Sequence, residues 1–282
     1  MRYEYEDVSL YYEVHGTGQP VLLLHGRPMD SRAMRAIFEP ILAERPGYQR
    51  IYVDLPGMGR TGASEAIQSN DDVAALMARF MADCFPGEPF LLAGLSYGGY
   101  ISRGVLYHAA ERVAGMLLLV PAVQGAGERQ LPPPLVVAPD PQAVNLLPAP
   151  FNEFFNQFLV VQNEAIVAHI RDEILPGMQA ADQAMMARLS ENYNYSFAVD
   201  ELVELFDRPV LILCGKHDTV TGYQAAVNLL PLYPRATLAV LDRAGHGLNL
   251  EQPALFTHLV DEWLDRVEEY QRQPVGLADL TG

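Results

Sequence analysis

Residues 90–99 of the chain are FLLAGLSYGG, an apolar run followed by a serine that has a glycine two positions before it and another two positions after it. The apolar run predicts a buried β-strand, and the helical spacing that begins at Tyr97 predicts a helix directly after the serine. In a sharp turn from strand to helix the serine is held in a strained backbone conformation, and Gly94 and Gly98 keep the chain from colliding with itself. The stretch therefore predicts that Ser96 is a catalytic nucleophile at the end of a strand.

Strand-like and helix-like segments alternate on both sides of this turn. Short apolar runs that end in glycine, proline or a small polar turn are typical of buried parallel strands, and most of them are separated by stretches with helical spacing. The alternation predicts an α/β fold, a mostly parallel, doubly wound sheet with helices on both faces. The predicted strands are 21–24, 50–53, 90–93, 116–120, 210–213 and 237–241, and the predicted helices are 30–44, 71–84, 97–110, 223–232 and 253–270.

The alternation breaks between residues 122 and 207, where a proline-rich connector precedes helix-like segments rich in Phe, Met and Tyr. A structureless loop of that length is unusual within a domain, so we predict that 122–207 is a helical cap. The cap would be inserted into a core domain formed by 1–121 and 208–273. Residues 2–18 alternate apolar and polar side chains and predict an antiparallel hairpin at the sheet edge. We expect 274–282 to be a flexible tail.

A nucleophilic serine needs a general base and a third group that orients the base. Because the carboxyl ends of parallel strands meet at one edge of the sheet, both groups should follow later strands. Asp218 follows the predicted strand 210–213, and His246, between two glycines, follows 237–241. The other six histidines fit packing or solvent exposure better. Three further acids better fit surface ion pairs or helix caps, namely Asp200, Asp207 and Asp242.

Acyl transfer also needs two donors that face the developing oxyanion. The first candidate is the backbone N–H of Tyr97, at the start of a helix whose dipole favours negative charge. The second is the N–H of Arg27, in the loop after the predicted strand 21–24. Pro28 has no N–H to donate, and Gly26 would let the loop approach the serine.

The bulk composition excludes several classes of protein. The chain has 282 residues, 50% of them hydrophobic, and 19 Lys and Arg against 35 Asp and Glu give a formal charge of −16, which disfavours a nucleic-acid partner. Its two cysteines suggest neither a disulfide framework nor a metal site. The charged N-terminus lacks the apolar stretch of a secretory signal, and no run is long enough to span a bilayer. We expect a cytoplasmic protein with no membrane partner and no metal.

Taken in order along the chain, these motifs resemble the α/β-hydrolase fold enzymes with a helical cap. The resemblance implies a triad of Ser96, His246 and Asp218, an oxyanion hole formed by the amides of Tyr97 and Arg27, and no cofactor. The matching segments are His25-Gly26, Asp54-x-Pro-Gly57-x-Gly59, Gly94-x-Ser96-x-Gly98-Gly99, Asp218 and Gly245-His246.

The same comparison separates this chain from some members of that superfamily. A haloalkane dehalogenase or an epoxide hydrolase would have Asp at the position of Ser96. Capped peptidases that release an N-terminal proline usually have Trp where this chain has Tyr97. The resemblance is therefore to a capped serine hydrolase of the esterase or proline iminopeptidase type, and Tyr97 weakens the second of these two interpretations without eliminating it.

The predicted cap is expected to select the substrate, because its aromatic and methionine side chains would form an apolar roof. We predict hydrolysis of a small ester, or of an amide or carbon–carbon bond, through an acyl-enzyme on Ser96, with a small-molecule substrate that has an apolar part. One alternative is an aminopeptidase of the proline iminopeptidase type, in which a cap acid binds the amine; another is a ligand-binding or signalling module. The predicted substrate-binding residues are Gly26, Phe154, Phe158, Tyr193 and Tyr195, and the candidate acids are Glu153, Glu164, Glu173 and Glu191.

Overall fold

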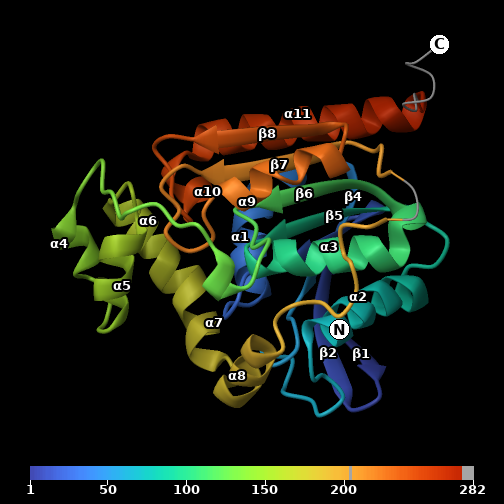
Figure 1. Cartoon of the computed structure of the whole chain (residues 1–282), viewed down its shortest axis with the longest axis horizontal. Helices are drawn as coiled ribbons and strands as arrows, with labels where there is room; N and C mark the ends of the chain where they lie inside the picture. The colour runs from blue at the N-terminus through green and yellow to red at the C-terminus, as the bar shows by residue number, and fades with distance from the viewer. Residues whose placement is uncertain (203–204, 275–282) are drawn as a thin grey trace.

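The computed structural model describes residues 1–202 and 205–274, and its strands form one twisted sheet of eight (Figure 1). The order across the sheet is β1-β2-β4-β3-β5-β6-β7-β8. β1 and β2 form an antiparallel hairpin at the edge, β2 is antiparallel to β4, and all other pairs are parallel. The predicted α/β fold with a mostly parallel sheet is confirmed. The strands are β1 Arg2–Tyr5, β2 Val8–His15, β3 Gly18–Leu24, β4 Gly47–Val53, β5 Phe90–Leu95, β6 Val113–Leu119, β7 Val210–Gly215 and β8 Ala236–Leu241.

Helices cover both faces of the sheet because neighbouring residues of each strand point to opposite sides. In β3, Val21 and Leu23 pack against α1 and α11, whereas Leu22 and Leu24 pack against α2 and α3. Both clusters are fully buried, which is why the strands are continuous apolar runs in the sequence. The helices are α1 Ser31–Leu42, α2 Asn70–Cys84, α3 Tyr97–Ala109 and α11 Pro253–Arg272.

The predicted helix 223–232 is wrong in its length. The structure has a short helix α9, Gln224–Val227, followed by a separate 3₁₀ turn, Leu230–Leu232. Pro231 lies within that turn and has no backbone N–H, so the hydrogen-bond ladder of an α-helix cannot continue through it. The sequence periodicity did not reveal this break.

The segment between β6 and β7, residues 120–209, is called the insertion here. Its helices lie beyond the carboxyl ends of the strands (Figure 1), and α4, α5 and α6 share a small apolar cluster that is separate from those of the sheet. α8 instead packs Met185, Met186 and Leu189 into the cluster above α2 and α3. The insertion contains α4 Pro141–Val144, α5 Phe151–Phe158, α6 Glu164–His169, a π-helical turn Ile170–Ile174, α7 Leu175–Ala180 and α8 Gln183–Glu191.

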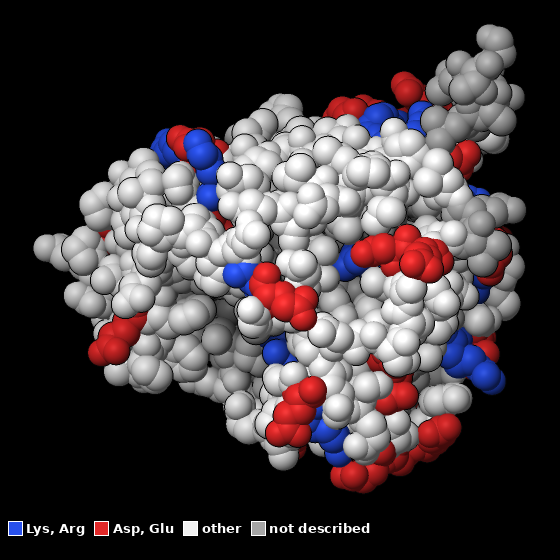
Figure 2. Space-filling model, viewed as in Figure 1, with Lys and Arg blue, Asp and Glu red and all other residues white. Residues whose placement is uncertain are grey.

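Charged side chains are distributed rather than clustered on the face shown in Figure 2, where acidic and basic groups are interspersed and the surface is hollowed beside the insertion. No helix in the described part of the chain is long and apolar enough to cross a membrane. The predicted flexible tail, 274–282, lies outside the described residues apart from residue 274.

Candidate active site

Ser96 lies in the turn between β5 and α3, with φ 53° and ψ −113°. This left-handed conformation is rare for a residue with a side chain and is typical of strained functional turns. A Cβ atom on Gly94 would lie 2.4 Å from the carbonyl oxygen of Gly98, and a Cβ atom on Gly98 would lie 2.0 Å from that of Leu24. Both glycines are therefore required for the turn to form against β3, as the sequence suggested.

His246 and Asp218 reach Ser96 from the loops after β8 and β7. The Nε2 atom of His246 lies 2.9 Å from Oγ of Ser96, and its Nδ1 atom lies 2.8 Å from Oδ2 of Asp218. Because an ionised carboxylate can only accept, Nδ1–H donates to Asp218, and Nε2 is free to accept the hydroxyl proton of Ser96. The structure thus brings together the three side chains that were predicted from widely separated motifs.

Asp218 is completely buried and has several hydrogen-bond donors besides the histidine. Its Oδ1 accepts from the N–H groups of Val220 and Thr221, and the hydroxyl of Thr221 donates to Oδ2 at 2.7 Å. Burial alone would raise the pKa of Asp218, but the nearby His246 and these donors outweigh it and hold the pKa below its usual value. The carboxylate is therefore ionised and fixed in position beside the imidazole.

The two predicted oxyanion donors flank the serine. In the described residues, neither the backbone N–H of Tyr97 nor that of Arg27 donates to an acceptor. Tyr97 is the first residue of α3, where helix geometry leaves the N–H without a partner. Gly26 lies close to the nucleophile, since a Cβ atom there would be 3.3 Å from Cβ of Ser96. Both N–H groups are available to a substrate oxygen near Ser96.

His25 holds the loop that carries Arg27. Its Nδ1–H donates to the carbonyl oxygen of Gly26 at 2.8 Å, and its Nε2 accepts from the N–H of Leu55 at 3.0 Å. This pair of contacts requires a neutral ring, and burial lowers the pKa of His25 accordingly. His25 therefore ties the loop after β3 to the loop after β4 and takes no part in the triad, as the sequence analysis expected.

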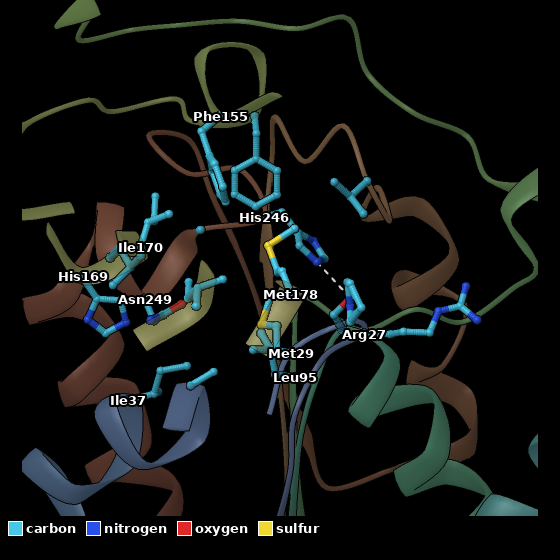
Figure 3. Close-up of a pocket in the computed structure, with 18 of the residues that line it drawn as sticks. Arg27, Met29, Ile37, Leu95, Phe155, His169, Ile170, Met178, His246 and Asn249 are labelled. Carbon is cyan, nitrogen blue, oxygen red and sulfur yellow. Dashed lines mark hydrogen bonds between the residues drawn. The ribbon is translucent and has the colours of Figure 1, made fainter. Parts of the chain in front are cut away.

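An apolar cavity of about 110 Å³ opens beside Ser96 and His246 (Figure 3). Two of the predicted substrate-binding residues, Phe154 and Phe158, line it, and the ring of Phe158 packs edge-on against the imidazole of His246 with 5.6 Å between centroids. No Asp or Glu side chain lines this cavity. Its other walls come from both the core and the insertion, including Met29, Ile37, Leu95, Phe155, Ile170 and Met178.

Tyr193 and Tyr195, which were predicted to bind substrate, are not among the residues that line the cavity. The ring of Tyr195 stacks on Tyr100 of α3 at 4.5 Å, and its hydroxyl donates to the carbonyl oxygen of Tyr100. Tyr193 packs against the same ring at 4.7 Å. Their rings pack the end of the insertion against α3.

The Arg27 side chain lies against two tyrosine rings. Its guanidinium carbon lies 5.4 Å from the ring centroid of Tyr97 and 5.7 Å from that of Tyr193. Asp30, which caps α1, instead pairs with Arg32. The Arg27 side chain thus packs on aromatic faces beside the active site.

Sequence reasoning missed Glu251, which lies in a short helix, α10 Leu248–Glu251, five residues after His246. Its carboxylate accepts from the N–H groups of Gly245 and Val160, each at 2.6 Å, and of Val161 at 3.2 Å. The side chain is almost completely buried, and burial raises its pKa. A lone acid in the apolar stretch Leu248-Asn-Leu-Glu251 was the signal that could have revealed it. Glu251 joins the histidine loop to the insertion.

Comparisons with known proteins show the family to which the chain belongs. The model of the alpha/beta hydrolase family matches residues 21–259, so the chain belongs to that family. No cluster of His, Cys, Asp and Glu in the described ranges is arranged to hold a metal ion.

Several relatives resemble the chain over most of its length. It is 26% identical to the pimeloyl-acyl-carrier-protein methyl ester esterase of Nitrosomonas europaea over 259 residues, which cover 90% of this chain and 98% of the relative. It is 28% identical to carboxylesterase YbfK of Bacillus subtilis, over 83% of this chain and 76% of the relative. The crystal structure of an alpha/beta superfamily hydrolase from Oenococcus oeni superposes with a TM-score of 0.83 at 26% identity, covering 95% and 99% of the two chains. The chain is an enzyme of the hydrolase class.

Proposed function

We propose that this enzyme is a serine esterase that cleaves a small carboxylic ester through an acyl-enzyme on Ser96. The observation that carries the proposal is the continuous hydrogen-bonded series from Ser96 through His246 to Asp218, with contacts of 2.9 and 2.8 Å. Such a series supplies the nucleophile, the base and the orienting carboxylate that acyl transfer requires. The two relatives described above are both esterases, which supports an ester substrate. Other relatives are named as a carbamate hydrolase and as a 2-hydroxy-6-oxononadienedioate hydrolase, so the names alone do not separate an ester from an amide or a carbon–carbon bond.

In the acylation step, Oγ of Ser96 attacks the ester carbonyl carbon while its proton passes to Nε2 of His246. The electron pair of the carbonyl π bond moves onto oxygen, and the N–H groups of Tyr97 and Arg27 donate to that oxyanion. Asp218 stabilises the imidazolium without taking its proton. When the oxyanion collapses, the bond to the alcohol oxygen breaks, and the alcohol leaves with the proton from Nε2.

In the deacylation step, a water molecule takes the place of the alcohol. Nε2 of His246 removes a proton from the water as its oxygen attacks the acyl carbon, and the same two N–H groups bind the second oxyanion. Collapse breaks the bond to Oγ of Ser96, which recovers the proton from His246, and the carboxylic acid is released.

The cavity suggests what the acyl group looks like. A cavity of about 150 Å³ can hold benzene, so the 110 Å³ next to Ser96 suits a group of about four or five non-hydrogen atoms beyond the ester carbonyl. Its walls combine core residues with α5, α7 and the π-helical turn of the insertion. We therefore infer that residues 122–207 act as a cap over the core domain and shape the pocket for an apolar acyl chain.

The aminopeptidase alternative finds less support. Binding a free amine in an apolar pocket calls for a carboxylate partner, because an unpaired buried ammonium is costly. None of the candidate acids lines the cavity, and three of them are exposed to solvent. The four acids are Glu153, Glu164, Glu173 and Glu191.

The proposal is tested by the hydrolysis of p-nitrophenyl acetate. We expect the wild-type enzyme to release p-nitrophenol and Ser96→Ala to lose at least about 1,000-fold in kcat/KM, because the nucleophile is removed. Ser190→Ala is a matched control, since Ser190 is an exposed serine of α8 that bonds within its own helix. An unchanged rate in Ser96→Ala contradicts the proposal, and cleavage of aminoacyl arylamides in preference to esters supports the aminopeptidase.

A further inference from the structure

One side of the apolar cavity carries polar groups that the proposed chemistry does not use. His169 and Asn249 both line the cavity, and Figure 3 shows them beside Ile37 and Ile170, on the side away from His246 and Arg27. Nε2 of His169 is buried and has no hydrogen-bond partner among the described residues. The amide of Asn249 likewise makes no side-chain hydrogen bond there. Because buried polar groups are normally paired, Nε2 of His169 needs a partner that enters the cavity, and the half-buried amide of Asn249 is placed to share that partner.

The backbone around His169 is also unusual. His169 is the last residue of α6 and directly precedes the π-helical turn Ile170–Ile174. π-Helical turns are rare and occur frequently at functional sites, because the extra residue changes the direction in which neighbouring side chains point. Here both ends of the turn, Ile170 and Ile174, line the cavity together with His169. The π-helical turn thus places the imidazole of His169 in a mostly apolar part of the cavity wall.

We propose that His169 and Asn249 form a subsite for an uncharged hydrogen-bonding group, such as a ketone oxygen, at the far end of a short apolar acyl chain. The inference rests on the proposed esterase function, because it assumes that the acyl group occupies the cavity. The ester carbonyl lies at Ser96, the methylene groups contact the apolar wall, and the distal oxygen accepts from the imidazole or the amide N–H.

The charges around this subsite disfavour an anionic group. Glu173 and Asp172 lie near His169, and the adjacent cation, Arg171, pairs with Asp172 and is not among the residues that line the cavity. A further carboxylate would therefore be repelled. The arginine that lines the cavity, Arg27, lies on the opposite side (Figure 3). Burial lowers the pKa of His169, which keeps the ring neutral at pH 7 and able to donate to an uncharged oxygen.

The test compares p-nitrophenyl esters of oxo acids with alkanoates of equal chain length: 4-oxopentanoate with pentanoate, 5-oxohexanoate with hexanoate, and 6-oxoheptanoate with heptanoate. We expect kcat/KM to favour the oxo ester about tenfold for at least one length, which is the effect of one hydrogen bond. His169→Leu and Asn249→Leu should each reduce the ratio of kcat/KM for the oxo ester to kcat/KM for the matched alkanoate. His108→Leu, at an exposed histidine outside the cavity, should keep the preference.

The same comparison can be made without turnover. Calorimetry with Ser96→Ala should show methyl 5-oxohexanoate binding about tenfold more tightly than methyl hexanoate, so a failure of the proposed reaction does not obscure the subsite. The inference is overturned if no oxo ester is preferred, if both leucine variants keep the preference, or if mono-p-nitrophenyl glutarate, with its distal carboxylate, is the best substrate. Preference without any dependence on Ser96 would instead overturn the esterase proposal.

Discussion

At the residue scale, hydrogen bonds of the Ser96 N–H and carbonyl groups stabilise the strained backbone of this residue. The N–H of Ser96 donates to the carbonyl oxygen of Leu119, and its carbonyl oxygen accepts from the N–H groups of Gly99, Tyr100 and Ala122. A left-handed conformation at a residue with a side chain costs about 1–3 kcal/mol and persists only where its surroundings fix it. These bonds reach β6 and α3 at once, so the turn holds Oγ toward His246 without help from a substrate.

The role of Asp218 can be tested by replacing one of its carboxylate oxygens with an amide nitrogen. In Asp218→Asn the amide can present an N–H to Nδ1, which would move the imidazole proton to Nε2 and leave no base for Ser96. We expect kcat to fall by about 10,000-fold with little change in KM. Steady-state kinetics with p-nitrophenyl acetate measure this.

Asp242→Asn is the matched control, because Asp242 is an exposed acid at the end of β8 that pairs with Lys216 and His217. It should change kcat less than twofold. Equal losses in the two variants would contradict the role assigned to Asp218.

Since the native pKa of Asp218 is lowered, the stability from its ionisation is present above the unfolded value of about 3.9 and is lost as the pH falls through the native pKa. Asp218→Asn should therefore weaken the pH dependence of the unfolding free energy on the acid side.

At the scale of elements, Glu251 of α10 joins two segments that are distant in sequence. Its Oε1 accepts from Val160 and Val161 after α5, and its Oε2 accepts from Gly245 just before His246. The loop that carries the proposed base and the insertion that encloses the cavity are thus held by one carboxylate. Glu251 is a positioning residue in this account, since it acts through the backbone of its neighbours.

Glu251→Gln should loosen both segments, because one acceptor oxygen becomes an NH₂ group facing an N–H donor. We expect the free energy of unfolding to fall by about 1–3 kcal/mol and kcat to fall more than KM rises. Urea denaturation and steady-state kinetics provide the two measurements, and Glu262→Gln, at an exposed acid of α11 paired with Arg266, is the control. A variant as stable and active as Glu262→Gln would show that the link is dispensable.

The raised pKa of Glu251 predicts a second effect of Glu251→Gln, on the pH dependence of stability. Its native pKa is raised above 4.5, so the native state keeps the proton to higher pH than the unfolded chain does. Ionisation of this carboxyl therefore removes stability as the pH rises from about 4.5 through the native pKa. Glu251→Gln should flatten the pH dependence of stability in that window, which Glu262→Gln should not do.

At the scale of the whole molecule, the sequence predicted those features that depend on local patterning and on chain order. The apolar runs predicted the buried strands because both faces of the sheet are covered. The order of Ser96, Asp218 and His246 predicted their meeting point because parallel strands present their carboxyl ends at one edge.

The features that the sequence did not reveal depend on how short helices of the insertion pack. Tyr193 and Tyr195 have aromatic side chains that would suit a pocket wall, but these side chains pack against Tyr100 instead of lining the cavity. His169 was assigned to packing or solvent because nothing local shows that a π-helical turn places it on the cavity. The role of Glu251 could not be predicted because it depends on backbone N–H groups from two separate segments of the chain. In each case the deciding contact is with a segment that is remote in sequence.

Labelling with a fluorophosphonate tests the central claim most directly, because an activated serine displaces fluoride from the reagent and becomes phosphonylated, whereas ordinary serines react far more slowly. The account predicts one label per chain, carried by the peptide that contains Ser96, no label in Ser96→Ala, and much slower labelling in Asp218→Asn. Intact mass and peptide mapping measure all three. A label on any other residue, or equal labelling of Ser96→Ala, would contradict the claim that Ser96 is the nucleophile of this hydrolase.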